Sequence, residues 1–251
     1  MNCCRKPRQR LKRKHKMTLP FFYKEDLIAS DTAVVLDEAG SKHIVQVLRM
    51  QNGEQLQLTN GKGDLFITEI IDNNRKRCAV KVIQKSKIDN PKSKITIAIS
   101  LTKNTQRFEW FLEKATEIGV SEIIPLICER TEKTTFKADR LKSILISAML
   151  QSQQTRLPVL HEPVKFKQLV ESSAQEQKFI AHCIDGAKRN LSDLNNEAMS
   201  SKIILIGPEG DFTPEEIKFA LQNNFSAVAL GETRLRTETA GMVAATLLRL
   251  V

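Results

Sequence analysis

Short runs in which apolar and polar residues alternate fill the first third of the chain. A strand with one buried face is indicated by each of four runs, TAVVLDE, EQLQLTN, DLFITEII and CAVKVIQ. Asn-Gly pairs at 52–53 and 60–61, on either side of the second run, are typical of hairpin turns. One interruption, SKHIVQVLRM at 41–50, fits a short helix. Residues 17–88 are therefore predicted to form a small β-barrel-like domain.

The pattern changes after a polar linker at 85–94 that is broken by Pro91. An apolar strand is expected at 95–101, followed by a helix at about 105–118 that Gly119 ends. The helix is expected to place Trp110 in the core. Later runs are too apolar for one-sided strands: EIIPLIC, FIAHCI, IILIG and AVALG. Residues 89–251 are thus predicted to be an α/β domain whose parallel sheet is covered on both faces.

Ligands of such sheets bind outside the carboxyl ends of the strands, which directs attention to the loops at 101–107, 207–213 and 231–238. The second loop begins the stretch GPEGDFTPEEI. Thr213 is a good N-cap, and Glu216 completes a capping box three residues later. A helix start after a glycine turn usually suggests phosphate.

Four acidic side chains argue against phosphate at this turn: Glu209, Asp211, Glu215 and Glu216. The lysine of the P-loop pattern is also absent. Since like charges repel, a nucleoside triphosphate is excluded, and a neutral or cationic ligand with an adenine-like part fits better. A plain strand-to-helix turn without a ligand stays open as the alternative.

The last 22 residues, LGETRLRTETAGMVAATLLRLV, predict a loop carrying Arg234 and Arg236 and then a helix. The helix is apolar nearly all round and contains several small residues. Such a helix belongs to a core or to a subunit interface, and we expect both, in a homodimer.

Charge is unevenly distributed along the chain. The formal net charge is +10, but the first sixteen residues hold eight Lys or Arg and no acid, which leaves 31 basic against 29 acidic residues. Residues 1–16 are interpreted as a disordered basic leader ahead of Met17, or else as an arm that binds phosphates.

No run approaches the ~20 apolar residues of a membrane span. Five cysteines without CxxC spacing indicate reduced thiols in the cytoplasm and no metal site.

Four stretches together resemble the RsmE family of SPOUT-class methyltransferases, which methylate uridine N-3 in 16S ribosomal RNA. They are HIVQVLRM, QRFEWFLEKATEIGVSEIIPL, LIGPEGDFTPEEI and LGETRLRTETAG. The resemblance runs from about residue 19 to the end, in the family's order. It implies a PUA-like RNA-binding β-barrel, then an α/β domain with a trefoil knot around S-adenosylmethionine, and a homodimer. The small ribosomal subunit is the implied partner.

The implied cofactor explains the acidic turn, because S-adenosylmethionine has no phosphate and bears a sulfonium cation. Glycines let the backbone approach its adenosine. Carried over by motif, the cofactor-binding residues are Leu205, Gly207, Gly210, Leu230, Gly231, Leu235, Arg236 and Thr239.

Methyl transfer to uracil N-3 also requires that this nitrogen lose its proton. Arg236 is expected to stabilise the developing negative charge. Glu238 or Glu209 is expected to orient that arginine or to accept the proton. As alternatives, Glu238 could be a helix-start carboxylate that meets the helix dipole, and Glu209 a hydrogen-bond acceptor that closes a loop.

Basic and aromatic candidates for RNA contact are more dispersed. His43 and Arg49 match the barrel motif, and later loops offer Lys103, Arg107, Arg130 and Arg156, each of which also fits a solvated surface charge. His182 is interpreted as a packed strand residue. The sequence departs from the family pattern at Asp211, where a second glycine is usual, and at Gln154, where an arginine is common. The rival functions are a SPOUT-class 2′-O-ribose methyltransferase and a non-enzymatic RNA-binding protein.

Overall fold

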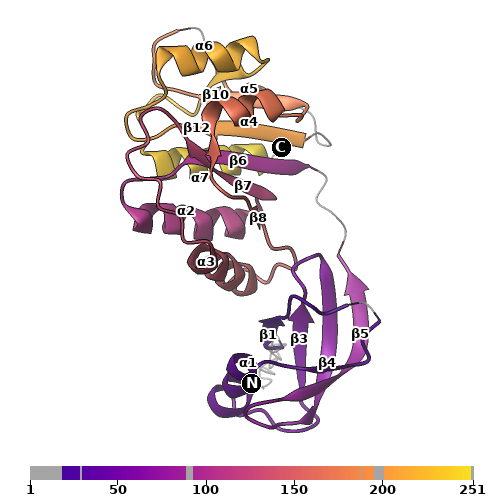
Figure 1. The fold of residues 1–251 in the computed structure, drawn as a ribbon. Coiled ribbons are helices and arrows are strands. Elements are labelled where there is room, and N and C mark those ends of the chain that lie inside the picture. Colours follow the sequence, from indigo (N-terminus) through magenta and orange to yellow (C-terminus); the bar gives the residue numbers. More distant parts are fainter. Residues whose placement is uncertain (1–18, 29, 89–92, 187, 195–200, 250–251) are drawn as a thin grey trace, which may run out of the picture.

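The computed structural model describes residues 19–28, 30–88, 93–186, 188–194 and 201–249, so the basic leader lies outside the described residues. The chain forms two bodies, each built on its own sheet (Figure 1). We call the body of β1–β5 the small domain and the body of β6–β13 the large domain.

The small domain is a five-stranded sheet in the order β1-β3-β4-β5-β2. Only the β1–β3 pair is parallel. Its elements are β1 (Phe21–Tyr23), β2 (Ala33–Val35), α1 (Glu38–Lys42), the π-helical turn η1 (His43–Val47), β3 (Gln55–Thr59), β4 (Asp64–Asp72) and β5 (Ala79–Lys87). Each of the four alternating runs overlaps one of these strands, and the helix predicted within 41–50 corresponds to the end of α1 and to η1. Strand β5 extends to Lys87, into the segment predicted to be the linker.

The large domain is an eight-stranded sheet whose pairs are all parallel, as predicted. The order is β11-β13-β10-β12-β6-β7-β8, with β9 also beside β7. The strands are β6 (Lys94–Ser100), β7 (Glu122–Ile127), β8 (Val159–Leu160), β9 (Val164–Lys165), β10 (Gln177–Ala181), β11 (Arg189–Asn190), β12 (Ser201–Ile206) and β13 (Ser226–Ala229).

Helices cover both faces of this sheet (Figure 1). They are α2 (Thr105–Ile118), α3 (Ala138–Gln151), α4 (Phe166–Ser172), α5 (Leu191–Leu194), α6 (Pro214–Gln222) and α7 (Thr237–Arg249). Neighbouring strand residues divide between two cores: Ile97 and Ile99 pack with α2, α3 and α7, while Ala98 packs with α4 and α6. This alternation explains why the strands are apolar on both faces.

Helix α2 has the predicted bounds, and Gly119 ends it in a left-handed conformation with φ 89°. The prediction that Trp110 is a core residue is wrong, because 43% of it is exposed. The buried face of α2 is formed by Phe108, Phe111, Leu112 and Ala115. Position 110 is rotated away from that face, since residues one or two apart on a helix do not share a side.

Helix α7 lies in the core, which is one of the two positions predicted for it from the sequence. A Cβ atom at Gly241 would lie 2.7 Å from a Phe111 ring carbon and 2.8 Å from Ile99 Cδ1, so this position needs glycine. Ala244, Ala245 and Leu248 are fully buried within the chain. The small residues therefore bring α7 close to α2 and β6. No helix in the described part of the chain is both long and apolar enough to cross a bilayer.

Candidate active site

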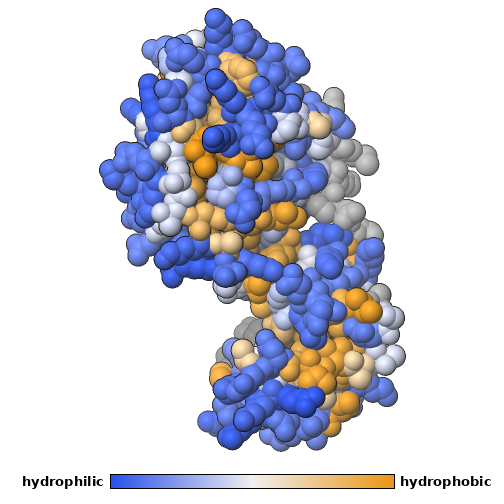
Figure 2. Space-filling model, viewed as in Figure 1, coloured by the Kyte–Doolittle hydropathy of each residue, from blue (hydrophilic) through white to orange (hydrophobic). Residues whose placement is uncertain are grey.

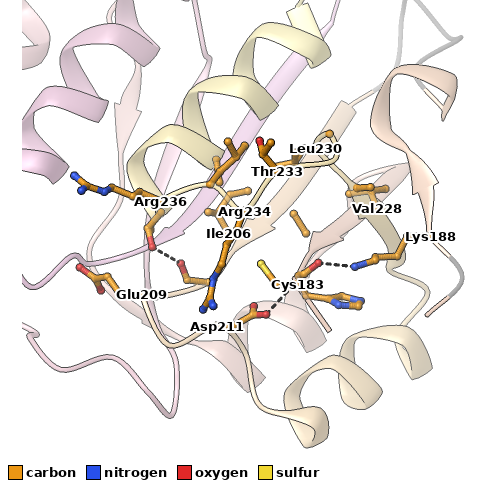
Figure 3. Close-up of a pocket in the computed structure, with 18 of the residues that line it drawn as sticks. Cys183, Lys188, Ile206, Glu209, Asp211, Val228, Leu230, Thr233, Arg234 and Arg236 are labelled. Carbon is orange, nitrogen blue, oxygen red and sulfur yellow. Dashed lines mark hydrogen bonds between the residues drawn. The ribbon is translucent and has the colours of Figure 1, made fainter. Parts of the chain in front are cut away.

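A cavity of about 730 Å³ lies at the carboxyl ends of β10, β12 and β13, against the loop that leads into α7 (Figure 3). Two of the three loops chosen from the sequence, at 207–213 and 231–238, contribute to its wall. The loop at 101–107 is absent from the lining. Its place is taken by the loop after β10, because β10 lies between β13 and β12 in the sheet.

Most of the residues expected to bind the cofactor line this cavity: Gly207, Leu230, Gly231, Leu235 and Arg236. Gly231 has φ 129°, and a Cβ atom there would meet no atom within 4 Å. The backbone at this position therefore borders open space.

Three expected cofactor residues lie outside the lining. Leu205, in β12, is fully buried in the core, and its neighbour Ile206 lines the cavity instead. Gly210 lies against Arg130, whose Cδ would be 3.3 Å from an added Cβ. Thr239 faces a second, smaller cavity.

The loop after β12 is held by its own acidic side chains. Asp211 adopts a left-handed conformation with φ 63°. Its carboxylate accepts hydrogen bonds from the N–H groups of Cys183 and Phe212, both at 2.8 Å. Asp211 thus joins the loop after β12 to the loop after β10.

The predicted capping box is present at the start of α6. The Glu216 N–H donates to Thr213 Oγ1 at 3.2 Å, and the Thr213 N–H donates to Glu216 Oε2 at 2.9 Å. Glu216 Oε1 accepts a further bond from the Glu129 N–H at 2.9 Å. Arg130 then donates to the Gly210 carbonyl at 2.7 Å. The loop after β7 therefore braces the loop after β12.

The two candidate catalytic glutamates have different surroundings. Glu209 lines the main cavity, and its Oε1 accepts a hydrogen bond from the Lys103 N–H at 3.0 Å. The Lys103 ammonium lies 2.7 Å from Glu132, which raises the pKa of this lysine. Arg236 and Glu209 lie at one end of the cavity and Lys188 at the other, with Cys183 between them (Figure 3).

Glu238 faces the second cavity, of about 280 Å³, which Trp110 and Asn104 also line. Its Oε1 is 3.6 Å from Arg107 Nε. Its Oε2 is buried and, among the described residues, has no hydrogen-bond partner. Thr237, one residue earlier, donates from Oγ1 to the Gly207 carbonyl at 3.1 Å and anchors the start of α7 to the cavity wall.

The loop after β10 holds residues that the sequence did not indicate: His182, Cys183, Asp185 and Lys188. The interpretation of His182 as a packed strand residue missed this position at the cavity wall. Burial, followed by the nearby Lys188 ammonium, lowers the pKa of His182. Lys188 Nζ donates to the carbonyls of His182 and Ile184, both at 3.0 Å. Only the strand order, which no local motif encodes, could have indicated this loop.

The expected RNA-contact residues are spread over both domains. His43 and Arg49 are exposed on the small domain, and the His43 ring meets Phe22 edge-on at 5.7 Å. Lys103 and Arg107 lie near the cavities. Arg130 and Arg156 both donate to backbone carbonyls. Within the described ranges, no cluster of three or more His, Cys, Asp or Glu is arranged to hold a metal ion.

Comparisons with known proteins agree with this geometry. Residues 89–249 match a family described as RNA methyltransferase domain, and residues 36–83 match one described as RNA methyltransferase PUA domain. A ribosomal RNA small subunit methyltransferase E from Mesomycoplasma hyopneumoniae is 31% identical, over 72% of this chain and 79% of that protein.

Two solved structures share the fold over nearly the whole chain. A probable rRNA-methyltransferase from Porphyromonas gingivalis superposes with a TM-score of 0.85 at 40% identity, covering 92% of this chain and 98% of that one. A ribosomal RNA small subunit methyltransferase E from Neisseria gonorrhoeae, bound to S-adenosyl methionine, has a TM-score of 0.80 at 28% identity, covering 90% and 95%.

Proposed function

Because the chain belongs to the ribosomal RNA small subunit methyltransferase E family, we propose that it methylates N-3 of a uridine in 16S ribosomal RNA. The methyl donor is S-adenosylmethionine. The observation that carries the assignment to this site is the cavity at the ends of β10, β12 and β13, walled by the GPEG turn and the loop before α7.

The residues of this cavity fit that cofactor. Its wall is formed largely by loop residues, and the open space beside Gly231 admits a ligand where a side chain would intrude. Glu209 and Asp211 disfavour a polyphosphate and tolerate a sulfonium cation. When bound, the cofactor supplies an electrophilic methyl group.

We assign direct cofactor contact to Gly207, Leu230, Gly231, Leu235 and Arg236. Leu205 and Gly210 support the same wall from behind, and Thr239 supports it from the far side of the α7 start. Thr237 contributes by fixing α7 to the Gly207 carbonyl.

Glu238 is the proposed acceptor of the N-3 proton. Its buried Oε2 has no protein partner among the described residues, and the residue lines the second cavity, so this oxygen is the one assigned to the N-3 proton of a uracil that enters there. Arg107 beside Oε1 keeps the carboxylate oriented. Glu209, by contrast, already accepts the Lys103 N–H and acts in positioning that loop. Arg236 stabilises the negative charge that develops on the uracil.

The RNA is proposed to lie across both domains. His43 and Arg49 would contact it from the small domain, and Lys103 and Arg107 beside the cavities. We propose the bounds 17–88 for a PUA-like barrel and 89–251 for the methyltransferase domain, with a trefoil knot in the latter. Figure 2 shows apolar residues gathered on one face of the small domain, and this patch is proposed to contact RNA bases.

A homodimer through the large domain and a cytoplasmic location complete the proposal. The large exposed indole of Trp110 on α2, beside the second cavity, supports a surface for a second copy near the reacting groups. A cytoplasmic location follows from the proposed substrate, the small ribosomal subunit.

The test is methyl transfer from tritiated S-adenosylmethionine to small ribosomal subunits that lack the modification, followed by identification of the labelled nucleoside. Labelled 3-methyluridine is expected. A label on a ribose 2′-oxygen would instead support the rival SPOUT activity. Cofactor binding without transfer to any ribosomal RNA would contradict the proposed substrate.

A further inference from the structure

The segment of residues 152–157, between α3 and β8, contacts both domains, and we call it the connecting segment. On the side of the small domain it pairs with the turn between β3 and β4. Lys62 and Arg156 form an isolated antiparallel bridge. The Gly63 N–H donates to the Thr155 carbonyl, and the Leu157 N–H donates to the Gly61 carbonyl, both at 2.9 Å. The two domains thus share backbone hydrogen bonds.

The guanidinium of Arg156 extends this pairing. Nη1 donates to the Lys62 carbonyl at 3.1 Å, and Nη2 donates to the Ile88 carbonyl at 2.8 Å. One side chain of the large domain therefore holds both the β3–β4 turn and the end of the last strand of the small domain. The five donors and planar shape of arginine suit it to bind two acceptors at once, which lysine cannot match.

Gly63 provides the space for this guanidinium. It has φ 96°, and a Cβ atom there would clash with Arg156 Nη2. Any larger residue at position 63 would displace the arginine as well as strain the turn. The contact between the domains therefore needs both Gly63 in the small domain and Arg156 in the large domain.

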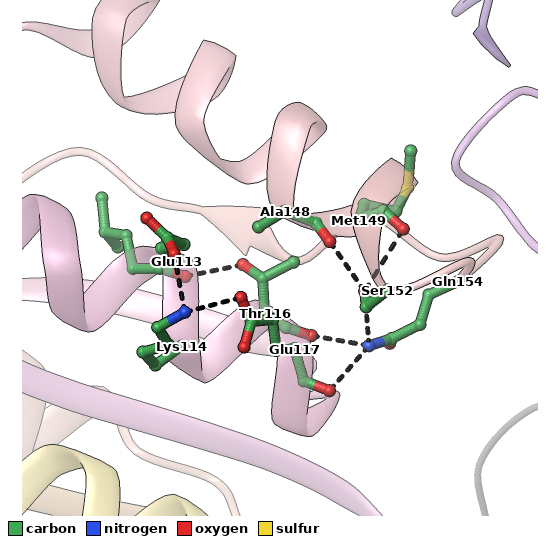
Figure 4. A network of polar contacts seen from close by, with 9 residues as sticks. Glu113, Lys114, Thr116, Glu117, Ala148, Met149, Ser152 and Gln154 are labelled. Atoms are coloured by element: carbon green, nitrogen blue, oxygen red, sulfur yellow. Dashed lines mark hydrogen bonds and ion pairs between the residues drawn. The ribbon is translucent and has the colours of Figure 1, made fainter. Parts of the chain in front are cut away.

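The other side of the connecting segment is bound to the ends of α2 and α3 (Figure 4). Gln154 Nε2 donates to the carbonyls of Thr116 and Glu117, at 2.8 and 2.9 Å, at the end of α2. Ser152 Oγ donates to the Ala148 carbonyl at 2.7 Å, at the end of α3. The last carbonyl groups of a helix have few or no N–H partners within that helix. The side chains of Gln154 and Ser152 supply hydrogen-bond donors to these carbonyl groups.

The first two turns of α2 carry Arg107 and Trp110, which line the second cavity with Glu238. The contacts therefore run from the small domain through Arg156 and Gln154 to α2, the helix whose Arg107 lies beside Glu238 of α7. We propose that Arg156 is a positioning residue, which fixes the small domain so that RNA held there presents its uridine to the cavity. This inference rests on the proposed function, and it replaces the sequence-based expectation that Arg156 binds an RNA phosphate.

The test compares four forms of the full chain for methylation of small subunits: wild type, Arg156→Ala, the double variant Lys62→Cys/Arg156→Cys, and Lys218→Ala. The last removes an exposed positive charge from α6 and is the charge control. Residues paired in an antiparallel bridge are close enough for a disulfide. Oxidised glutathione closes the cross-link and dithiothreitol opens it, with wild type treated in the same way.

Arg156→Ala is expected to lower kcat/KM for subunits by about tenfold or more, since misplaced reactants react slowly. Its dissociation constant for S-adenosylmethionine should match wild type. Oxidation of the double variant should restore most of the activity, and reduction should remove it again. Small-angle scattering should show a broader distribution of interdomain distances for Arg156→Ala than for wild type.

An oxidised double variant that stays as inactive as Arg156→Ala, although the cross-link has formed, would overturn the inference and favour direct phosphate binding by the guanidinium. Unchanged kcat/KM in Arg156→Ala would overturn it as well. Wild type that binds the cofactor but methylates no subunit would contradict the proposed function instead. The scattering comparison still tests the link between the domains in that case.

Discussion

The carboxylate of Glu209 accepts a hydrogen bond from the N–H of Lys103, at 3.0 Å, and so joins the loops that follow β12 and β6. This hydrogen bond distinguishes Glu209 from Glu238, the two candidate proton acceptors that the sequence could not tell apart. Glu209 is occupied in holding a loop, whereas Glu238 keeps a buried oxygen that no described residue binds. The two therefore respond differently to the same substitution.

Glu238→Gln is expected to lower kcat by about 10²- to 10⁴-fold, because the amide cannot accept the N-3 proton. Glu209→Gln retains an oxygen that accepts the Lys103 N–H, so its kcat should stay near that of wild type. Single-turnover methylation of small subunits at saturating cofactor measures both. The reverse order of the two effects would show that Glu209 takes the proton.

Asp211 fastens two loops of the cavity, and its replacement tests what that contact contributes. Asp211→Gly should weaken S-adenosylmethionine binding by about fivefold, as expected when one hydrogen bond worth ~1 kcal/mol is lost. Stability should change little, because glycine favours the left-handed conformation at φ 63°. Asp211→Asn keeps one of the two acceptor oxygens, which can still accept from the Cys183 N–H, so it should bind the cofactor more tightly than Asp211→Gly. Equal affinities for the glycine variant and wild type, by calorimetry, would contradict this role.

Cysteine reactivity reports on occupancy of the cavity. Cys183 is exposed at the wall, whereas Cys128 and Cys78 are buried. Burial, followed by the charge of Glu216, raises the pKa of Cys128; burial, followed by Asp72, raises that of Cys78. Because the thiolate is the reactive form, iodoacetamide should label Cys183 first.

Saturating S-adenosylmethionine should slow the labelling of Cys183 and leave the slow labelling of Cys128 unchanged. Peptide mass spectrometry separates these sites from the two cysteines near the start of the chain. Labelling of Cys183 at the same rate with and without the cofactor would place the ligand elsewhere.

Glu216 closes the capping box and also binds the loop after β7. Glu216→Ala leaves two backbone N–H groups without their acceptor and should lower the free energy of unfolding by about 2 kcal/mol or more. Thr213→Ala removes only the cap and should cost about 1 kcal/mol. Urea denaturation measures both. Glu215→Ala is the control in the same turn, and a loss there equal to that of Glu216→Ala would contradict the account.

Local chemistry explains why much of the fold could be predicted. The bounds of α2 follow from the spacing of Phe108, Phe111 and Leu112 and from Gly119, which are all close in sequence. The start of α6 follows from its capping box. The strands β1, β8, β9 and β11 have two or three residues each and owe their existence to neighbouring strands, so no periodicity reveals them.

The site was predictable only where motifs and strand ends coincide. Gly207 and Gly231 mark two walls of the cavity from sequence alone. His182 and Lys188 could not be found, because the position of β10 between β13 and β12 is a property of the whole sheet. The exposure of Trp110 and the bonding of Arg156 to the small domain likewise depend on tertiary packing.

Calorimetric titration with S-adenosylmethionine tests most directly whether the cavity at β10, β12 and β13 is the methyl-donor site. Gly231→Val and Gly53→Val form a matched pair. Both glycines have positive φ, 129° and 88°, and neither has an atom within 4 Å of an added Cβ. Only Gly231 borders the cavity. We predict one bound cofactor per chain for wild type and Gly53→Val, and binding weakened by about tenfold or more, a loss of ~1.4 kcal/mol, for Gly231→Val. Undiminished binding by Gly231→Val, or an equal loss in Gly53→Val, would contradict the assignment of the site.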